Sequence, residues 1–212
     1  MGLVLAAGSG RRMGAPKALL RTTSGESWAA RAARVLGEGG CSPVLVTTGA
    51  GGEQVARGLP AGVRALPVAD AATGLGAGLR AGLDAAGALH PDLDAVVVTL
   101  VDLPDVDARA VASVLAAAGP HPRSALVRAT WAGRPGHPVL LGRDALPAAR
   151  RGARGDTGAR GLLAGADVVL VEQHPAPGRG GDVDSPGLLP AGTRWPDGVD
   201  APAPAVAEGV SR

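Results

Sequence analysis

The sequence predicts an α/β protein in which helices cover both faces of a mostly parallel, Rossmann-like sheet, giving three α/β/α layers. Short apolar runs alternate with segments of helical spacing along most of the chain, as in βαβ units. The run 95–101 is apolar on both of its faces, as expected of a central parallel strand. A glycine-rich basic loop directly follows the first apolar run, where strand ends of such sheets bind ligands. The 212 residues suffice for one such domain.

Each expected element follows from its pattern. Apolar runs of four to seven residues favour strands, and they occur at 2–6, 43–48, 63–68, 95–101, 124–130, 138–141 and 167–171. Helical spacing predicts helices at 28–36, 52–59, 73–86 and 106–118. In the third of these, Leu75, Leu79 and Leu83 are four apart and share one face. Glycines interrupt 145–163, which is expected to form two short helices.

The sequence divides into a domain at 1–189 and a tail at 190–212. Pro, Gly, Ala and Asp dominate the tail and hydrophobic periodicity is lost, so we expect it to be disordered.

Composition narrows the classes of function. Aromatic residues make up only 1% of the chain, so Leu, Val and Ala must form the core. The net charge is +2, and no basic run is interleaved with stacking aromatics, so no nucleic-acid partner is expected. The single cysteine excludes an internal disulfide and a cysteine metal cluster. Without a signal peptide or a membrane-spanning apolar run, we expect a cytoplasmic protein with no membrane partner.

The loop after the first apolar run is suited to binding phosphates. Its glycines, Gly8, Gly10 and Gly14, let backbone amides approach an anion. Arg11, Arg12 and Lys17 add positive charge. Lys17 is the only lysine of a chain rich in arginine, which suggests a compact point charge on a phosphate oxygen rather than an accidental surface lysine.

Two familiar phosphate-binding motifs do not fit this loop. A Walker A motif ends in Gly-Lys-Ser/Thr, but Ala15 and Pro16 separate Gly14 from Lys17. A dinucleotide fingerprint has its third glycine where Met13 stands, and the run 43–48 ends without the expected acid. The absence of tyrosine excludes a tyrosine-dependent dehydrogenase.

Acidic residues at two places could hold a divalent cation. Asp102 directly follows the run 95–101, and Mg²⁺ prefers one or two carboxylates with substrate phosphates and water. The alternative role, a helix cap, suits Asp105 and Asp107 better. Asp182 and Asp184 lie in an extended Gly-Asp-Val-Asp-Ser-Pro segment; one of them, preferably Asp184, could reach the same cation, unless the segment is a solvated turn.

Two glycine-flanked motifs could bind an acceptor substrate. His137 lies in Gly-His-Pro and could donate a hydrogen bond, or it could be a structural turn residue. The Gly-Asp-Thr-Gly segment 155–158 could bind through its backbone amides, or it could simply cap a helix.

In this order, these motifs resemble the MobA-like nucleotidyltransferases. Leu5-Ala-Ala-Gly-Ser-Gly-Arg-Arg-Met-Gly-Ala-Pro-Lys17 is similar to the opening loop of that family, and Leu-Val-Asp102-Leu-Pro to its metal aspartate. The glycine-rich stretch 74–82 resembles its base-contacting helix start, and the three later motifs follow in the family's order. Alanine at Ala7, where the guanylyltransferase branch prefers glycine, points to molybdenum cofactor (molybdopterin) cytidylyltransferases.

The resemblance implies a fold like that of nucleotide-diphospho-sugar transferases and the transfer of CMP from CTP to molybdopterin, with Mg²⁺ or Mn²⁺ and release of pyrophosphate. It also implies a phosphorylated pterin-type acceptor and a molybdoenzyme maturation partner. Three alternatives stay open. One is GTP or another NTP with a sugar or polyol phosphate, and another is a non-catalytic nucleotide-binding protein. An NAD enzyme is the most distant, for the reasons of loop spacing given above.

Read together with this resemblance, the motifs assign a role to each candidate residue. The expected catalytic residues are Lys17, Arg12 and Asp102. The expected metal ligands are Asp102 and Asp184. The nucleotide is expected to contact Leu5, Ala6, Ala7, Gly8, Gly10, Arg11, Gly14, Lys17, Thr73, Gly74 and Gly76. The acceptor is expected to contact His137, Asp156, Thr157 and Gly158.

Overall fold

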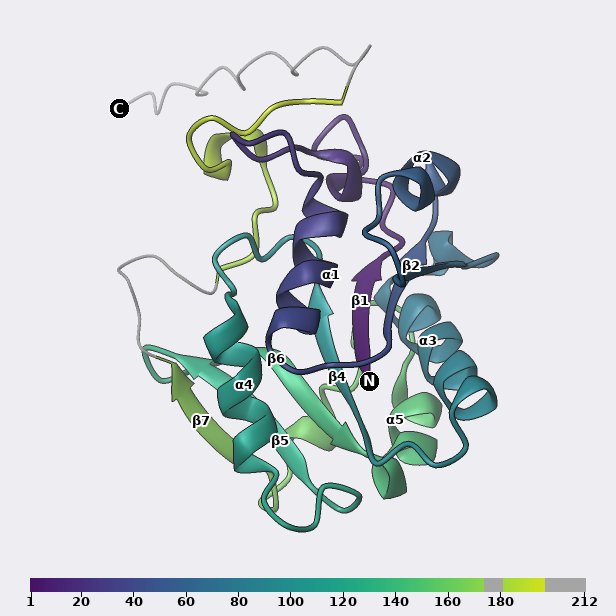
Figure 1. The fold of residues 1–212 in the computed structure, drawn as a ribbon, viewed down its shortest axis with the longest axis vertical. Helices are drawn as coiled ribbons and strands as arrows, with labels where there is room; N and C mark the ends of the chain where they lie inside the picture. The colour runs from purple at the N-terminus through teal and green to yellow at the C-terminus, as the bar shows by residue number, and fades with distance from the viewer. Residues whose placement is uncertain (174–180, 197–212) are drawn as a thin grey trace, which may run out of the picture.

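The computed structural model describes residues 1–173 and 181–196, which contain a seven-stranded sheet of order β3-β2-β1-β4-β6-β5-β7 (Figure 1). The strands are β1 (Gly2–Ala6), β2 (Val44–Thr48), β3 (Arg64–Pro67), β4 (Ala95–Leu100), β5 (Leu126–Trp131), β6 (Arg134–Gly142) and β7 (Val169–Gln173). The first four strands are mutually parallel, and β5 and β7 are also parallel. Only β6 runs antiparallel to its neighbours, so the prediction of a mostly parallel sheet is confirmed.

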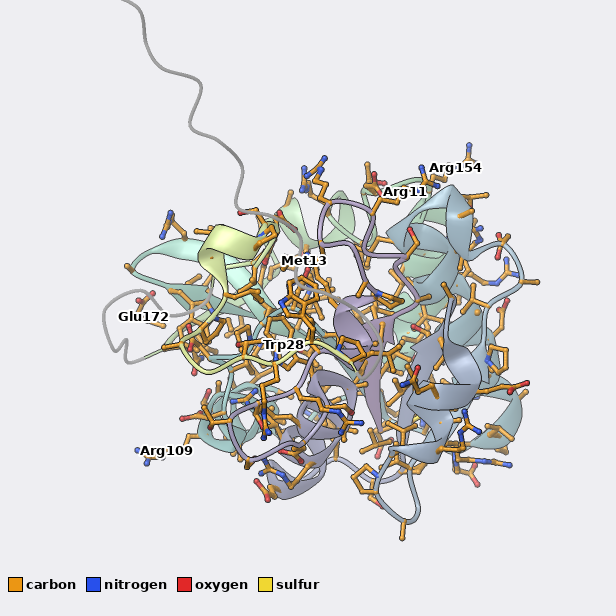
Figure 2. The ribbon with its side chains drawn as sticks, turned by 90° about the horizontal axis from the view of Figure 1, so that it is seen from above. Arg11, Met13, Trp28, Arg109, Arg154 and Glu172 are labelled. Atoms are coloured by element: carbon orange, nitrogen blue, oxygen red, sulfur yellow. The ribbon has the colours of Figure 1, made fainter. Side chains whose placement is uncertain are left out.

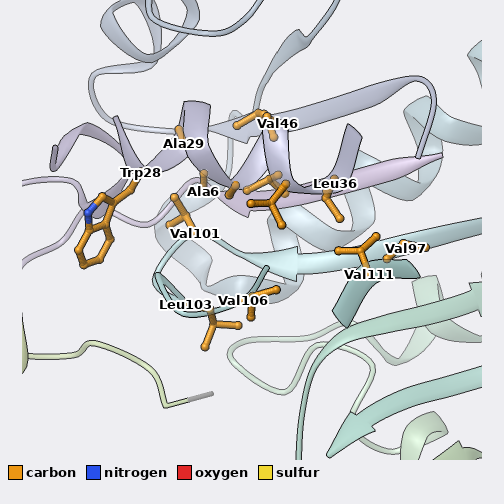
Figure 3. Close-up of a cluster of buried hydrophobic side chains, with 14 of the residues drawn as sticks. Ala6, Trp28, Ala29, Leu36, Val46, Val97, Val101, Leu103, Val106 and Val111 are labelled. Carbon is orange, nitrogen blue, oxygen red and sulfur yellow. The ribbon is translucent and has the colours of Figure 1, made fainter. Parts of the chain in front are cut away.

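Helices cover both faces of the sheet, as predicted. They are α1 (Trp28–Glu38), α2 (Gly52–Arg57), α3 (Leu75–Leu89), α4 (Ala108–Ala117) and α5 (Leu146–Gly152). Trp28 and Leu36 of α1 and Val111 of α4 pack with strand residues on one face (Figure 3). On the other face, α3 and α5 pack on a second cluster, to which α3 contributes Leu79 and Leu83.

Strand residues alternate between these two clusters. In β1, Val4 belongs to the cluster under α1, whereas Leu3 and Leu5 belong to the cluster under α3. Successive side chains of a strand point to opposite faces, so one apolar run supplies both cores. This explains why the central strand β4 is apolar throughout.

The predicted helix caps involve short polar side chains. The Ala110 amide donates to the Asp107 side chain over 3.0 Å at the start of α4. Asp107 therefore takes the capping role and leaves Asp102 available for another task.

The structure lengthens the predicted strand 138–141 to the nine residues of β6. Two residues with positive φ, Ala132 (51°) and Gly133 (74°), connect β5 to β6 in a tight hairpin. The first part of β6 pairs with β5, whereas its pairing with β4 involves only its last four residues, 139–142. Proline normally argues against a strand, so Pro135 and Pro138 concealed the first part of β6 in the sequence. They are tolerated because this part of the strand is paired on one side only. His137 consequently lies within β6 and not in a turn.

Two further segments differ from expectation. Residues 145–163 form α5 and then turns that lead into a short 3₁₀ helix (Leu162–Ala164), instead of two α-helices. In the segment 190–196, Arg194 exchanges backbone hydrogen bonds of 2.8 and 2.9 Å with Arg21, and Trp195 packs against the cluster under α1. The chain thus stays attached beyond the division expected at 189, because Trp195 provides an apolar contact. The rest of the expected tail, 197–212, lies outside the described residues.

Among the described residues, no helix combines the length and the apolar character that crossing a membrane requires.

Candidate functional site

The carboxyl ends of β1 and β4 open into a cavity of about 440 Å³. The loop after β1, the segment that begins at 181 and the turn before α3 gather above these strand ends (Figure 1). Of the residues predicted to bind nucleotide, the following line the cavity: Leu5, Ala7, Gly8, Gly10, Arg11, Lys17, Thr73 and Gly74. Arg12, Asp102 and Asp184 line it too. The structure therefore brings the expected catalytic and metal-binding residues to one place.

Lys17 bridges the two carboxylates at the centre of this cavity. Its Nζ lies 2.7 Å from Asp102 Oδ2 and 2.7 Å from Asp184 Oδ1. Burial alone would lower the pKa of Lys17, but the hydrogen bonds to Asp102 and Asp184 outweigh it, and the pKa is raised. The same hydrogen bond from Lys17 lowers the pKa of Asp184. Three side chains from distant parts of the chain thus form one hydrogen-bonded cluster.

Asp184 reaches this cluster because its segment is fixed to the strand end. The Val183 amide donates to the Asp102 carbonyl oxygen over 3.1 Å, and the Val183 side chain is buried. Asp182 instead lines a second cavity. The two aspartates serve different cavities, and it is Asp184 that faces Asp102 across Lys17.

The donor set at Asp102 fits a divalent cation. Its Oδ1 is buried and accepts no hydrogen bond from any described residue, although Oδ2 accepts one from Lys17. An unpartnered buried carboxylate oxygen is costly unless a cation or donor satisfies it. Across residues 1–173 and 181–196, no three acidic, histidine or cysteine side chains gather as a complete metal site. The arrangement thus suits Mg²⁺ or a similar ion that keeps water and substrate phosphates as its other ligands.

The glycines of the loop after β1 have different roles in the structure. Gly10 has φ +65°, and a Cβ there would collide with the Ala15 backbone, so the loop's own path requires this glycine. At Gly8, by contrast, a side chain would meet nothing within 4 Å, so the backbone there is open to a ligand. The fully buried side chain of Met13 holds the loop to the core, whereas Arg11 lies at the rim of the cavity (Figure 2).

Three residues predicted to contact nucleotide do not line the cavity, namely Ala6, Gly14 and Gly76. The Ala6 side chain is buried in the core, and its amide donates to Thr47 Oγ1 over 3.1 Å. Gly14 has φ +75° in the return of the loop. The amide of Gly76 donates to the Gly155 carbonyl oxygen over 2.7 Å, so Gly76 joins two loops instead of facing a ligand.

The turn before α3 and the 153–158 loop form one hydrogen-bonded junction. The Leu75 amide donates to Asp156 Oδ1 over 3.3 Å, so Asp156 satisfies a free amide at the start of α3. Arg80 spans the same junction, donating to the Ala153 carbonyl oxygen over 2.6 Å and to Asp70 Oδ2 over 2.8 Å. The sequence suggested that the segment 155–158 caps the helix that follows it. In the structure, Asp156 of this segment instead caps α3, which lies far away in the sequence.

Replacing Gly74 by alanine should loosen this junction. Gly74 has φ +112° and ψ −176°, a region that only glycine occupies readily, and a Cβ would lie 2.6 Å from Asp156 Oδ1. We expect Gly74→Ala to lower the free energy of unfolding by about 1–3 kcal/mol in urea titrations. The control Gly87→Ala lies in the same helix with open space around it, and it should stabilise the protein by about 0.5–1 kcal/mol. Equal stabilities for the two variants would contradict this account.

A second cavity, of about 420 Å³, adjoins the first. Both cavities are lined by Leu5, Leu75, Leu100 and Asp156. All four residues predicted to bind the acceptor line the second cavity, namely His137, Asp156, Thr157 and Gly158. The wall also includes Arg128, Trp131, Arg160 and Asp182. Most of the predicted nucleotide residues and all of the predicted acceptor residues therefore line two adjoining cavities.

His137 is a half-buried, uncharged histidine beside a cation. Burial, with the nearby charge of Arg128, lowers the pKa of His137 to about 4. Its carbonyl oxygen accepts a hydrogen bond of 2.9 Å from Trp131 Nε1, which fixes this part of β6. At neutral pH the imidazole can donate one hydrogen bond and accept another.

The lowered pKa of His137 predicts a pH-dependent stability. In the unfolded chain the histidine has a pKa near 6.5 and binds a proton below that pH. In the folded protein, His137 binds this proton only near pH 4. Unfolding should therefore become easier as the pH falls from about 6.5 toward 4. Between pH 7 and pH 5, we expect wild-type protein to lose on the order of 1 kcal/mol more stability than His137→Gln in urea titrations. His121→Gln, in an exposed loop, should lose as much as wild type; a His137→Gln variant that follows the same curve would contradict the prediction.

Sequence reasoning missed Thr47, Arg128 and Trp131 as cavity residues. Polar Thr47 at the end of an apolar run and charged Arg128 inside another were usable signals. Trp131 offered no signal, because its position depends on the hairpin that joins β5 to β6.

Comparison with known proteins agrees with this geometry. Residues 2–174 match the family of MobA-like NTP transferase domains. Nicotine blue oxidoreductase from Paenarthrobacter nicotinovorans is 33% identical over 168 residues, which span 76% of this chain and 80% of that protein.

Solved structures share the fold. Rv0371c from Mycobacterium tuberculosis H37Rv superimposes with a TM-score of 0.73 at 24% identity, covering 88% of this chain and 93% of that one. Rv0371c is also known in complex with manganese, with a TM-score of 0.67, 23% identity and coverage of 82% and 88%. A nucleotidyl transferase from Methanothermobacter gives a TM-score of 0.69 at 22% identity and covers 82% and 87%.

Proposed function

We propose, since this chain belongs to the MobA-like NTP transferase family of nucleotidyltransferases, that it transfers CMP from CTP to the phosphate of a molybdopterin-type acceptor. The observation that supports this reaction is the convergence of Lys17, Asp102 and Asp184 in one cavity that adjoins another. A two-substrate transfer needs two adjoining binding sites with charge-stabilising groups where they meet.

The reaction requires positioning and charge neutralisation more than proton transfer. An acceptor phosphate oxygen attacks the α-phosphorus of CTP, a new P–O bond forms, and the bond to the β-phosphate breaks to release pyrophosphate. The attacking group is already an anion, so no strong general base is needed. Lys17, Arg12 and the open amides near Gly8 are suited to hold the β- and γ-phosphates and to stabilise the leaving pyrophosphate.

Asp102 and Asp184 are the residues that would hold a divalent cation, Mg²⁺ or Mn²⁺. Such an ion supplies Lewis-acid polarisation of the α-phosphate. With the carboxylates engaged in this way, the amine of Lys17 becomes available to a phosphate oxygen. The unpartnered Oδ1 of Asp102 supports this assignment.

The preference for CTP rests on the family resemblance at Ala7. Ala7 and Leu5 line the first cavity together with the turn before α3, which is where a base would lie in this proposal. GTP, or another NTP with a sugar or polyol phosphate, is the alternative in the same class. A non-catalytic nucleotide-binding protein is disfavoured by the pairing of Asp102 with Asp184, because binding alone needs fewer charged groups.

The name of one relative, nicotine blue oxidoreductase, favours a second candidate, a redox reaction. One form of such a reaction would use a nicotinamide dinucleotide. The geometry of the loop disfavours it. A dinucleotide fold places the pyrophosphate at the start of a helix that directly follows the first strand. Here α1 begins only at Trp28, and the intervening loop is anchored by buried Met13.

The deciding experiment incubates the protein with labelled CTP, Mg²⁺ and molybdopterin, and measures pyrophosphate release and transfer of label. We expect both, with faster turnover for CTP than for GTP and none without acceptor. Parallel arms contain sugar phosphates, polyol phosphates, or NADH with an electron-accepting dye. Turnover only with a different nucleotide or acceptor, or only NADH oxidation, would overturn the assignment.

A further inference from the structure

The second cavity contains unbalanced positive charge. Arg128 projects from β5 into its wall, half-buried, with Nε 3.4 Å from the Gly136 carbonyl oxygen. Arg160 lines the same cavity and lowers the pKa of Arg128, adding to the larger effect of burial. Two positive charges that line one cavity repel each other, and the molecule must offset this cost by other contacts.

No described carboxylate balances this pair. Ion pairs in residues 1–173 and 181–196 join other arginines to acids, and neither Arg128 nor Arg160 forms one. Asp156 accepts the hydrogen bond from the Leu75 amide at the start of α3. Asp182 lines the same cavity but forms no ion pair with Arg128 or Arg160. His137, beside Arg128, is neutral.

A half-buried guanidinium without a carboxylate is costly in isolation, but it is well suited to bind an anionic ligand. The planar guanidinium matches the oxygens of a phosphate by paired hydrogen bonds, and a second arginine adds charge for a dianion. The cavity is large enough for a small organic molecule beside its anionic group.

We propose that Arg128 and Arg160 form an anion site that binds a phosphomonoester group of the acceptor. The identification of the ligand as the acceptor rests on the proposed transfer reaction, whereas the anion site itself does not. Arg128 and Arg160 then select phosphorylated acceptors over uncharged ones, and both act as specificity-determining residues outside the Lys17 cluster.

Phenyl phosphate is the probe, titrated into the full-length protein by calorimetry. Benzoate and phenol serve as the carboxylate and uncharged arms. We expect phenyl phosphate to bind, benzoate to bind at least tenfold more weakly, and phenol not to bind. Both Arg128→Gln and Arg160→Gln should weaken phenyl phosphate at least tenfold.

Two control variants locate the bound anion. Arg109→Gln removes an exposed arginine at the edge of the molecule (Figure 2). Arg12→Gln removes a cation from the first cavity. Both should retain wild-type affinity for phenyl phosphate. Loss of binding in Arg12→Gln alone would place the anion in the first cavity and overturn the proposal. Unchanged affinity in Arg160→Gln would also overturn it, and this exposed residue can be replaced without disturbing the core.

Kinetics separates this proposal from the transfer reaction. If the protein transfers CMP, Arg160→Gln should raise the KM for the acceptor at least tenfold and leave the KM for CTP unchanged. If phenyl phosphate binding depends on both arginines but no transfer occurs with any acceptor, the anion site stands and the proposed function fails. If Arg160→Gln transfers CMP normally with an unchanged KM for the acceptor, the proposed function stands and the anion site is refuted.

Discussion

Asp102→Ala should release pyrophosphate from CTP at least ~100-fold more slowly than wild type, the scale of a lost transition-state charge contact. Asp102 lies two residues after the end of β4, places Oδ2 2.7 Å from Lys17 Nζ and has a buried Oδ1 that finds no partner among residues 1–173 and 181–196. Its loss therefore removes both a counter-charge for Lys17 and the carboxylate best placed for a divalent ion. Asp102→Asn, which keeps the shape and removes the charge, should lose nearly as much.

Binding of Mn²⁺, followed by the paramagnetic resonance of the free ion, provides a second readout for these variants. We expect both to weaken Mn²⁺ binding in the presence of CTP, whereas Asp105→Ala, three residues away, should bind and react like wild type. Near-normal pyrophosphate release by purified Asp102→Ala would refute the role of this residue.

Lys17→Ala should cost at least ~100-fold in the same assay, because the amine contacts both carboxylates and lines the cavity together with the glycine loop. Lys17→Arg tests the inference from the single lysine of the sequence. Its side chain keeps the charge but replaces a compact ammonium by a broad planar group, so most of the activity should still be lost.

Stability separates catalysis from folding in these lysine variants. Lys17→Ala leaves Asp102, a side chain only 17% exposed, without its counter-charge, so some loss of thermal stability is expected. Lys17→Arg should unfold at nearly the wild-type temperature and still be slow. Arg57→Ala, an exposed residue of α2, controls for removal of a positive charge. An active Lys17→Arg enzyme would show that only charge is required at this position.

The convergence of Lys17 and Asp102 could be predicted because each follows a parallel strand of the same sheet. Carboxyl ends of parallel strands meet at one edge, so two motifs far apart in the sequence had to approach. Asp184 could be predicted only as a candidate, since nothing in its turn-like sequence specifies the bond from Val183 to the end of β4.

What escaped prediction depends on pairing between distant segments. Arg128 faces the second cavity because β5 lies between β6 and β7, and strand order is not written in local patterns. Pro135 and Pro138 hid the first part of β6. A proline has no amide hydrogen to pair with a neighbouring strand, and the free-energy cost of this loss depends on whether such a strand is present. Gly10 lines the first cavity, as expected of a ligand-facing glycine, but the sequence did not reveal that a Cβ there would also collide with the loop's own Ala15.

The junction held by Asp156 and Arg80 joins the turn that lines the first cavity to the loop that lines the second. A base that orders the turn at the start of α3 also orders the 153–158 loop, because the same hydrogen bonds belong to both. Under the proposed function, whatever the nucleotide adds to the affinity for the acceptor, the acceptor must add to the affinity for the nucleotide. Coupled binding of the two substrates is therefore an expected consequence of these shared hydrogen bonds.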